Sequence, residues 1–169
     1  TSLADYRLRH SQYKRTDTDL QAVHRQHPFI TVWDDHESTD NSWRDGANNH
    51  TEGVEGVWPE RKAFAQRAYD EWMPIRYPEP GNVNRIWRKF TFGSLMELIM
   101  LDTRLFDRDE QLATPLLPPD DPTDPARKLI GATQMEFLLS SLSNATTTWK
   151  FIGQQVMFGQ LKVAGLPDL

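Results

Sequence analysis

A run of charged and amide side chains in the first third of the sequence has the composition of a metal-binding site. Five residues within a stretch of eight supply three carboxylates, an imidazole and an amide, namely Asp34, Asp35, His36, Glu37 and Asn41. These groups are ligands that Ca²⁺, Fe³⁺, Mn²⁺ and Zn²⁺ accept, and an imidazole can also transfer a proton. On composition alone, the run predicts either metal-assisted acid–base chemistry or a solvated loop whose acids cap a turn.

The members of this run differ in how strongly they favour a direct role. Asp34 could bind a metal, or it could orient His36 or cap the following turn. For Glu37 we expect a structural role rather than ligation. Asn41 could hydrogen-bond a ligating carboxylate or cap the next turn, and the sequence leaves both roles open.

The position of the run strengthens the functional reading. Residues 17–26 predict a short helix that is capped by Asp17 and ended by His27 and Pro28. Residues 29–33 are all β-branched or aromatic, which predicts a strand buried on both faces. Charged side chains directly after such a strand lie where α/β proteins place their sites.

A long loop is expected to follow the charged run. Residues 38–58 are rich in Gly, Asn and Asp and show no sustained helical or strand period. Loops longer than about 12–15 residues without structure of their own are usually functional or disordered. Trp43 and Trp58 within this segment predict that it packs against the rest of the fold, which favours a functional loop.

The remaining elements predict an α/β arrangement with mixed strand directions and no internal repeat. A Thr133–Glu136 capping box is expected to start the last helix, and residues 113–128, with five prolines, are expected to form an exposed excursion. We expect a helix from Pro59 to Pro74, with Phe64, Ala68 and Trp72 on one face. Hairpin strands are expected on either side of Gly93 and Ser94. An amphipathic helix through Met135, Leu138, Leu139 and Leu142 and a buried strand over 149–153 are expected to follow.

Arg104 is the arginine best placed to meet a phosphate. It stands in the segment LDTR, at the predicted end of a strand. A guanidinium can bind phosphate through two hydrogen bonds, but it more often pairs with an acid. We therefore favour an ion pair with Asp102 or Asp107 over substrate contact.

Composition excludes several classes of protein. The chain has 169 residues, enough for one domain, and its eighteen aromatic side chains argue against disorder. The net charge of −5 disfavours nucleic-acid binding, and the absence of cysteine excludes thiolate metal sites. The mean hydropathy is −0.65, and no apolar run approaches the roughly 18 residues that a membrane span needs.

Five sequence blocks in a fixed order carry a family resemblance. They are YRLRHSQY, HPFITVWDDHESTDNSW, RKAFAQRAYDEWMPIR, IWRKFTFGSLMELIMLDTR with DRDEQL after it, and IGATQMEFLLSSLSNATTTWKFIGQQVMF. Together they resemble the PhoD-like alkaline phosphatases, in the calcineurin-like metallophosphoesterase group. The resemblance extends over nearly the whole chain.

The resemblance implies a fold and a chemistry. It implies the central part of a four-layer α/β/β/α sandwich with mixed sheets, and metal-dependent hydrolysis of phosphate mono- or diesters. The metals implied are Ca and Fe, with Mn or Zn as alternatives, and the location is periplasmic or extracellular although no signal peptide is visible. In register with the group's Gly-Asn-His-Asp or Gly-Asn-His-Glu pattern, Asp35 takes the place of the metal-binding Asn and His36 that of the catalytic His.

Two further blocks of the metallophosphoesterase group are missing. The chain contains no Gly-Asp pair and no histidine after His50. We therefore expect residues 1–169 to be a single, partial catalytic domain. The alternative is a truncated or degenerate relative that binds a partner or a sugar through its long loop. A glycosidase is disfavoured, because its two acids must face each other about 5–9 Å apart across a sugar, and neighbours on one loop seldom do.

Overall fold

The computed structural model describes residues 1–113 and 123–159 of the chain. Residues 114–122, within the predicted excursion at 113–128, lie outside the described part. The described chain holds four helices and three strands: α1 (Leu3–Thr16), α2 (Thr18–Gln26), α3 (Trp58–Trp72), β1 (Arg88–Phe92), β2 (Met96–Met100), α4 (Ala132–Ser143) and β3 (Trp149–Gly153).

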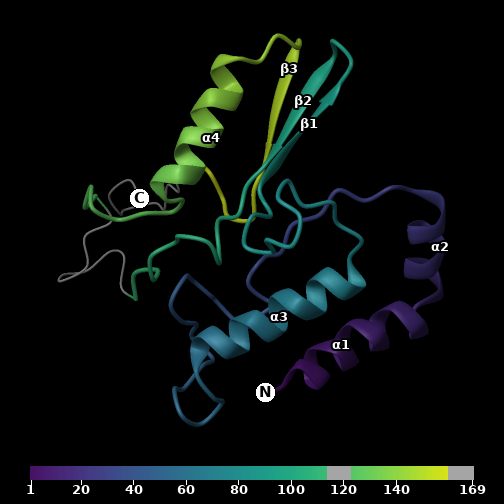
Figure 1. Cartoon of the computed structure of the whole chain (residues 1–169), viewed down its shortest axis with the longest axis vertical. Coiled ribbons are helices and arrows are strands. Elements are labelled where there is room, and N and C mark those ends of the chain that lie inside the picture. The colour runs from purple at the N-terminus through teal and green to yellow at the C-terminus, as the bar shows by residue number, and fades with distance from the viewer. Residues whose placement is uncertain (114–122, 160–169) are drawn as a thin grey trace, which may run out of the picture.

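The strands form one mixed sheet in the order β1-β2-β3, which confirms the predicted mixed α/β class. β1 and β2 are an antiparallel hairpin that pairs Phe92 with Met96, and Gly93 in the turn has a φ of 55°. β2 and β3 are parallel and are joined through α4, which runs beside the sheet (Figure 1). α1 lies against α3 at the other end of the molecule.

The two N-terminal helices are stabilised by different interactions. α2 begins as predicted, because the Asp17 carboxylate accepts hydrogen bonds from the backbone N–H groups of Asp19 (3.0 Å) and Leu20 (2.9 Å). α1 was not predicted, since none of its residues is buried and it has no apolar face. An ion pair of 2.6 Å between Arg7 and Glu71 links it to α3.

The core forms around aromatic side chains on the inner face of α3. Its buried residues are Trp33, Ala47, Trp58, Tyr69, Ile86 and Leu105. The predicted helix at α3 is confirmed, but its buried apolar face runs through Ala65, Ala68 and Tyr69 rather than through Phe64 and Trp72. The long loop packs as expected, with Trp58 buried and Trp43 against the core cluster.

The predicted buried strand at residues 29–33 is wrong. This segment has no strand assignment, Phe29 is 46% exposed, and only Trp33 is fully buried. Its Thr31 carbonyl accepts a hydrogen bond from the Arg88 guanidinium at 2.7 Å instead of from a neighbouring strand. β-branched composition favours an extended backbone, but a strand also needs a partner strand to pair with.

Two features of the C-terminal part also differ from expectation. β3 is a strand at the edge of the described sheet, but its side chains are exposed rather than buried, with Trp149 at 59%, because the described chain leaves much of both its faces uncovered. The Thr133–Glu136 capping box does not form, because the N-cap of α4 is Gly131, two residues before Thr133. A Cβ at Gly131 would lie 1.5 Å from the Asp107 carboxylate, so this close approach requires glycine.

No helix in residues 1–113 or 123–159 is long and apolar enough to cross a membrane.

Candidate metal centre

The charged run folds into a compact turn directly after Trp33. The Asp35 carbonyl accepts hydrogen bonds from the backbone N–H groups of Ser38 and Thr39, both at 2.8 Å. The Glu37 carboxylate accepts the Asp34 backbone N–H at 2.6 Å. Glu37 therefore closes the turn. We call residues 34–41 the acid turn.

Asp35 is the buried carboxylate of the acid turn, with 7% of the residue exposed. Its two oxygens accept the backbone N–H groups of His36 (3.0 Å) and Asn41 (2.8 Å). Burial alone would raise the pKa of Asp35, but the hydrogen bond from Asn41 and the positive charge of Arg104 outweigh it and lower the pKa. Asp35 is therefore a carboxylate over the whole neutral range.

Asn41 shapes the acid turn through its backbone. It is the only non-glycine residue of the described chain with a positive φ, at 50°, a conformation that asparagine tolerates better than most residues. This conformation turns its N–H toward Asp35. Of the two roles left open by the sequence, the structure thus shows hydrogen bonds to acids of the turn: the Asn41 backbone N–H donates to Asp35, and its side-chain amide donates to Asp40 at 3.5 Å.

Three side chains of the acid turn converge on one point. One oxygen each of Asp35 and Asp40 and one ring nitrogen of His36 lie within 4.8 Å of one another. His36 Nε2 is 3.6 Å from an Asp40 oxygen, and the His36 side chain is 78% exposed. Asp40 was not singled out from the sequence, although its spacing of four residues from His36 was a signal that could have identified it.

This donor set fits one metal ion. Two carboxylates and an imidazole are ligands that divalent and trivalent ions accept, and each Asp35 oxygen keeps a lone pair beyond the N–H that it already binds. Three donors leave room for water or substrate on the same ion. They are too few for the two or three ions of a complete multi-metal centre.

Arg104 lies behind the acid turn and is 90% buried. Its Nε donates to an Asp34 oxygen at 2.6 Å, and its Nη2 lies 3.8 Å from an Asp35 oxygen. The expected ion pair with Asp102 or Asp107 is wrong. Asp102 instead accepts the Arg104 backbone N–H at 2.9 Å, and Asp107 pairs with Arg44.

Two glutamines hold the segment that carries Arg104. Gln134 of α4 accepts the Asp102 N–H at 2.7 Å and donates to the Asp102 carbonyl at 2.8 Å. Gln155, after β3, accepts the Thr103 N–H at 2.8 Å and donates to the Leu101 carbonyl at 2.8 Å. We call these two side chains the amide clamp, because together they hold residues 101–103 between them.

Comparison with known proteins identifies the family. The family model described as PhoD-like phosphatase matches residues 1–168. This chain belongs to the PhoD-like phosphatases. It is 35% identical over 162 residues to alkaline phosphatase D of Bacillus subtilis (strain 168), and a solved structure titled "Structure of PhoD" superimposes with a TM-score of 0.82 at 34% identity.

The PhoD-like chain spans about a quarter to a third of the length of these relatives. The sequence match covers 94% of this chain and 27% of the B. subtilis protein. The structural match covers 99% of this chain and 32% of the solved one. The family resemblance inferred from the sequence blocks is thereby confirmed.

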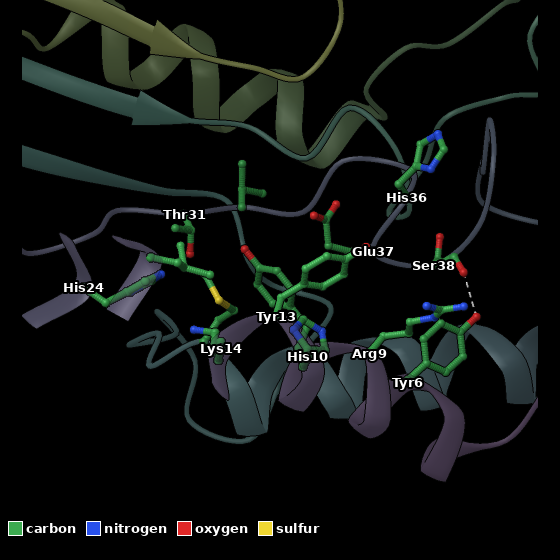
Figure 2. Close-up of a pocket in the computed structure, with 14 residues that line it drawn as sticks. Tyr6, Arg9, His10, Tyr13, Lys14, His24, Thr31, His36, Glu37 and Ser38 are labelled. Carbon is green, nitrogen blue, oxygen red and sulfur yellow. Dashed lines mark hydrogen bonds between the residues drawn. The ribbon is translucent and has the colours of Figure 1, made fainter. Parts of the chain in front are cut away.

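A cavity of about 510 Å³ separates the acid turn of this PhoD-like chain from α1. Figure 2 shows the His36 ring directed away from the side chains of α1 that line this cavity, whereas Tyr6 reaches the turn and donates to the Ser38 carbonyl at 2.7 Å. His36 lines the cavity as well, whereas Asp35 and Asp40 do not. Only one of the three converging donors therefore borders this cavity.

Proposed function

We propose that this chain contributes to metal-dependent hydrolysis of phosphate mono- or diesters. The observation that carries the proposal is the convergence of Asp35, His36 and Asp40 within 4.8 Å, in a chain that belongs to the PhoD-like phosphatases. A metal held there would polarise the phosphoryl oxygens and lower the pKa of bound water. Calcium and iron are the ions we expect first, with manganese and zinc as alternatives.

The residues of the acid turn take distinct roles in this proposal. Of the three converging donors, Asp35 and Asp40 hold the metal, and His36 stays unligated so that its ring nitrogen can carry a proton. The exposed ring of His36 donates a proton to the leaving-group oxygen. Asp34, predicted from the sequence as a further ligand, would have to give up Arg104 to reach a metal, so we propose that it holds Arg104 in place.

We further propose that residues 1–169 form part of one four-layer α/β/β/α domain that acts outside the cytoplasm. The low coverage of the relatives supports a partial domain, since 32% of the solved structure corresponds to this chain. The remaining metal ligands would then come from other parts of the domain. Fractionation of cells that produce the complete gene product tests the location.

The test is hydrolysis of chromogenic phosphate mono- and diesters by this chain and by the complete product of its gene. Each is assayed with and without Ca²⁺, Fe³⁺, Mn²⁺ and Zn²⁺. In the active form we expect His36→Ala to lower kcat by about 10²–10⁴-fold, the range for losing a general acid. His27→Ala is the matched control, since His27 is exposed at the end of α2.

Metal binding gives an independent reading of the same site. Asp35→Asn and Asp40→Asn should each weaken binding of the activating ion in a calorimetric titration, because each removes an anionic ligand. Absence of metal-stimulated hydrolysis in every form would contradict the proposal and favour the non-catalytic binding module.

A further inference from the structure

A second arginine follows Arg104 by four residues and differs from it in every contact. Arg108 is half-buried, and its Nη1 donates to the Thr103 carbonyl at 3.2 Å. In the part of the chain that the structure describes, no carboxylate lies within ion-pair distance of Arg108, and none of its nitrogens is both buried and unpartnered. Its remaining N–H donors therefore reach solvent.

Arg104 and Arg108 differ in whether an acid neutralises their charge. The charge of Arg104 is neutralised by Asp34 at 2.6 Å, and its side chain is only 10% exposed. Such a guanidinium cannot turn to a substrate without giving up its hydrogen bond to Asp34 and its approach of 3.8 Å to the buried Asp35 carboxylate. Arg108 has no carboxylate partner in the described chain, and a guanidinium without such a partner is suited to binding two oxygens of a phosphate.

Arg108 is held close to the acid turn by its neighbours. Its carbonyl accepts the Arg44 N–H at 3.1 Å, just beyond the acid turn. Three residues further on, Gln111 donates to the Asn41 carbonyl at 2.6 Å. Asp34 and Asp35 act electrostatically on Arg108, although burial dominates and lowers its pKa.

The Arg108 side chain also lines an open cavity of about 450 Å³. Three cations face it, namely Arg108, Arg127 and Lys128, together with the acids Asp109 and Asp124. Both acids are engaged locally, since Asp109 accepts the Lys128 N–H and Asp124 accepts the Ala126 N–H, each at 2.8 Å. An anion can therefore approach Arg108 from this side.

We infer that Arg108 is the residue that contacts the phosphoryl oxygens of the substrate, while Arg104 holds the Asp34 and Asp35 carboxylates in place. The inference rests on the proposed function, because it assigns Arg108 to the same acid turn. The ligand class is a phosphate ester, and inorganic phosphate carries the same oxygens. The supporting observation is that the open N–H donors of Arg108 have no carboxylate partner in the described chain, whereas the charge of Arg104 is already neutralised by Asp34.

The first experiment titrates inorganic phosphate into the chain, with and without Ca²⁺, and follows the arginine Nε–H signals by NMR. We expect the Arg108 signal to shift and the Arg104 signal to stay in place. Arg108→Gln should weaken phosphate binding at least tenfold, and Arg108→Lys should recover part of it. Arg127→Gln is the matched control, because Arg127 lines the same cavity, and should change binding less than twofold.

The outcomes separate the two proposals. Phosphate binding that depends on Arg108 supports the inference, even if no form of the protein hydrolyses an ester. If the complete gene product is active, Arg108→Gln should raise KM for the ester at least tenfold with an unchanged thermal unfolding midpoint. Undetectable phosphate binding, an equal effect of Arg127→Gln, or an unchanged KM in an active Arg108→Gln enzyme would overturn the inference.

Discussion

Two buried aspartates near the candidate site have opposite electrostatics. Asp35 receives two backbone N–H groups and the charge of Arg104, and its pKa is lowered. Asp102 is 1% exposed, and burial raises its pKa although its Oδ1 accepts the N–H groups of Arg104 and Leu105, both at 2.9 Å. The hydrogen bond from the Asn41 backbone and the charge of Arg104 thus keep the candidate ligand ionised, whereas burial dominates at the carboxylate that shapes the Arg104 segment.

This difference predicts opposite signs of pH dependence. The raised pKa of Asp102 means that the folded state binds its proton more tightly than the unfolded state does. The contribution of Asp102 to the free energy of unfolding is then fully present below its ordinary pKa of 3.8 and declines as the pH rises through the folded value. The difference in stability between wild type and Asp102→Asn should therefore shrink from pH 4 to pH 7.

Urea unfolding at several pH values measures this difference. Asp35→Asn serves as the comparison. Because the pKa of Asp35 is lowered from its ordinary value of 3.8, the stabilisation that its carboxylate provides is lost only as the pH falls below 3.8, which is the opposite sign to Asp102. Its difference from wild type should stay constant between pH 4 and 7. A constant difference for Asp102→Asn as well would show that burial does not control the Asp102 proton.

At the scale of elements, the segment after β2 depends on two elements that follow it in sequence. Gln134 comes from α4 and Gln155 follows β3, and each binds both a backbone donor and a backbone acceptor of residues 101–103. Those residues lead directly to Arg104 and Arg108. The amide clamp thereby couples the packing of α4 and β3 to the position of both arginines.

Replacing one member of the amide clamp should loosen this segment. Gln155→Met keeps the length of the side chain but removes its hydrogen bonds to Thr103 and Leu101, which should cost about 1–3 kcal/mol of unfolding free energy. Hydrogen exchange at the Thr103 amide should become faster. Gln154→Met is the matched control, since Gln154 makes no hydrogen bond in the described structure. An equal loss in both variants would argue against the amide clamp.

At the scale of the whole molecule, the described chain buries one face and exposes another. The aromatic core lies between α3 and the acid turn. On the side of α4 and β3, by contrast, Leu129, Met135 and Ile152 are exposed. A cavity of about 620 Å³ opens there, lined mainly by apolar side chains, including Leu101, Leu138 and Ile152.

This exposed cavity should bind an apolar dye in the native state. We expect the chain to enhance ANS fluorescence, because contiguous exposed apolar surface binds such probes. Ile152→Thr retains the β-branch of the strand residue and should reduce the enhancement. Val54→Thr is the control, because Val54 is exposed on the long loop and does not line this cavity, and it should leave the fluorescence enhancement unchanged. If Ile152→Thr enhanced ANS fluorescence as much as wild type does, the dye would bind outside this cavity.

Elements whose signals are local can be identified from the sequence alone. The Asp17 cap starts α2, the alternating residues on either side of Gly93 make the hairpin, and the apolar period of α4 makes a helix. Each needs only neighbours within a few residues, so no tertiary contact is required to identify it. The ordered blocks also identified the PhoD-like family, which the comparisons confirm.

Only the tertiary structure decided which residues meet across the chain. Residues 29–33 have strand composition but no strand beside them, and β3 is a strand whose faces stay exposed in the described chain. Arg104 pairs with Asp34, seventy positions away, rather than with the nearer Asp102 or Asp107. The acid with which an arginine pairs, and the strand beside which a segment lies, depend on which distant segments the fold brings together and which side chains it then buries. For this reason the acid turn was visible in the sequence, and the local spacing of Asp40 from His36 could have been, whereas the open guanidinium of Arg108 was not.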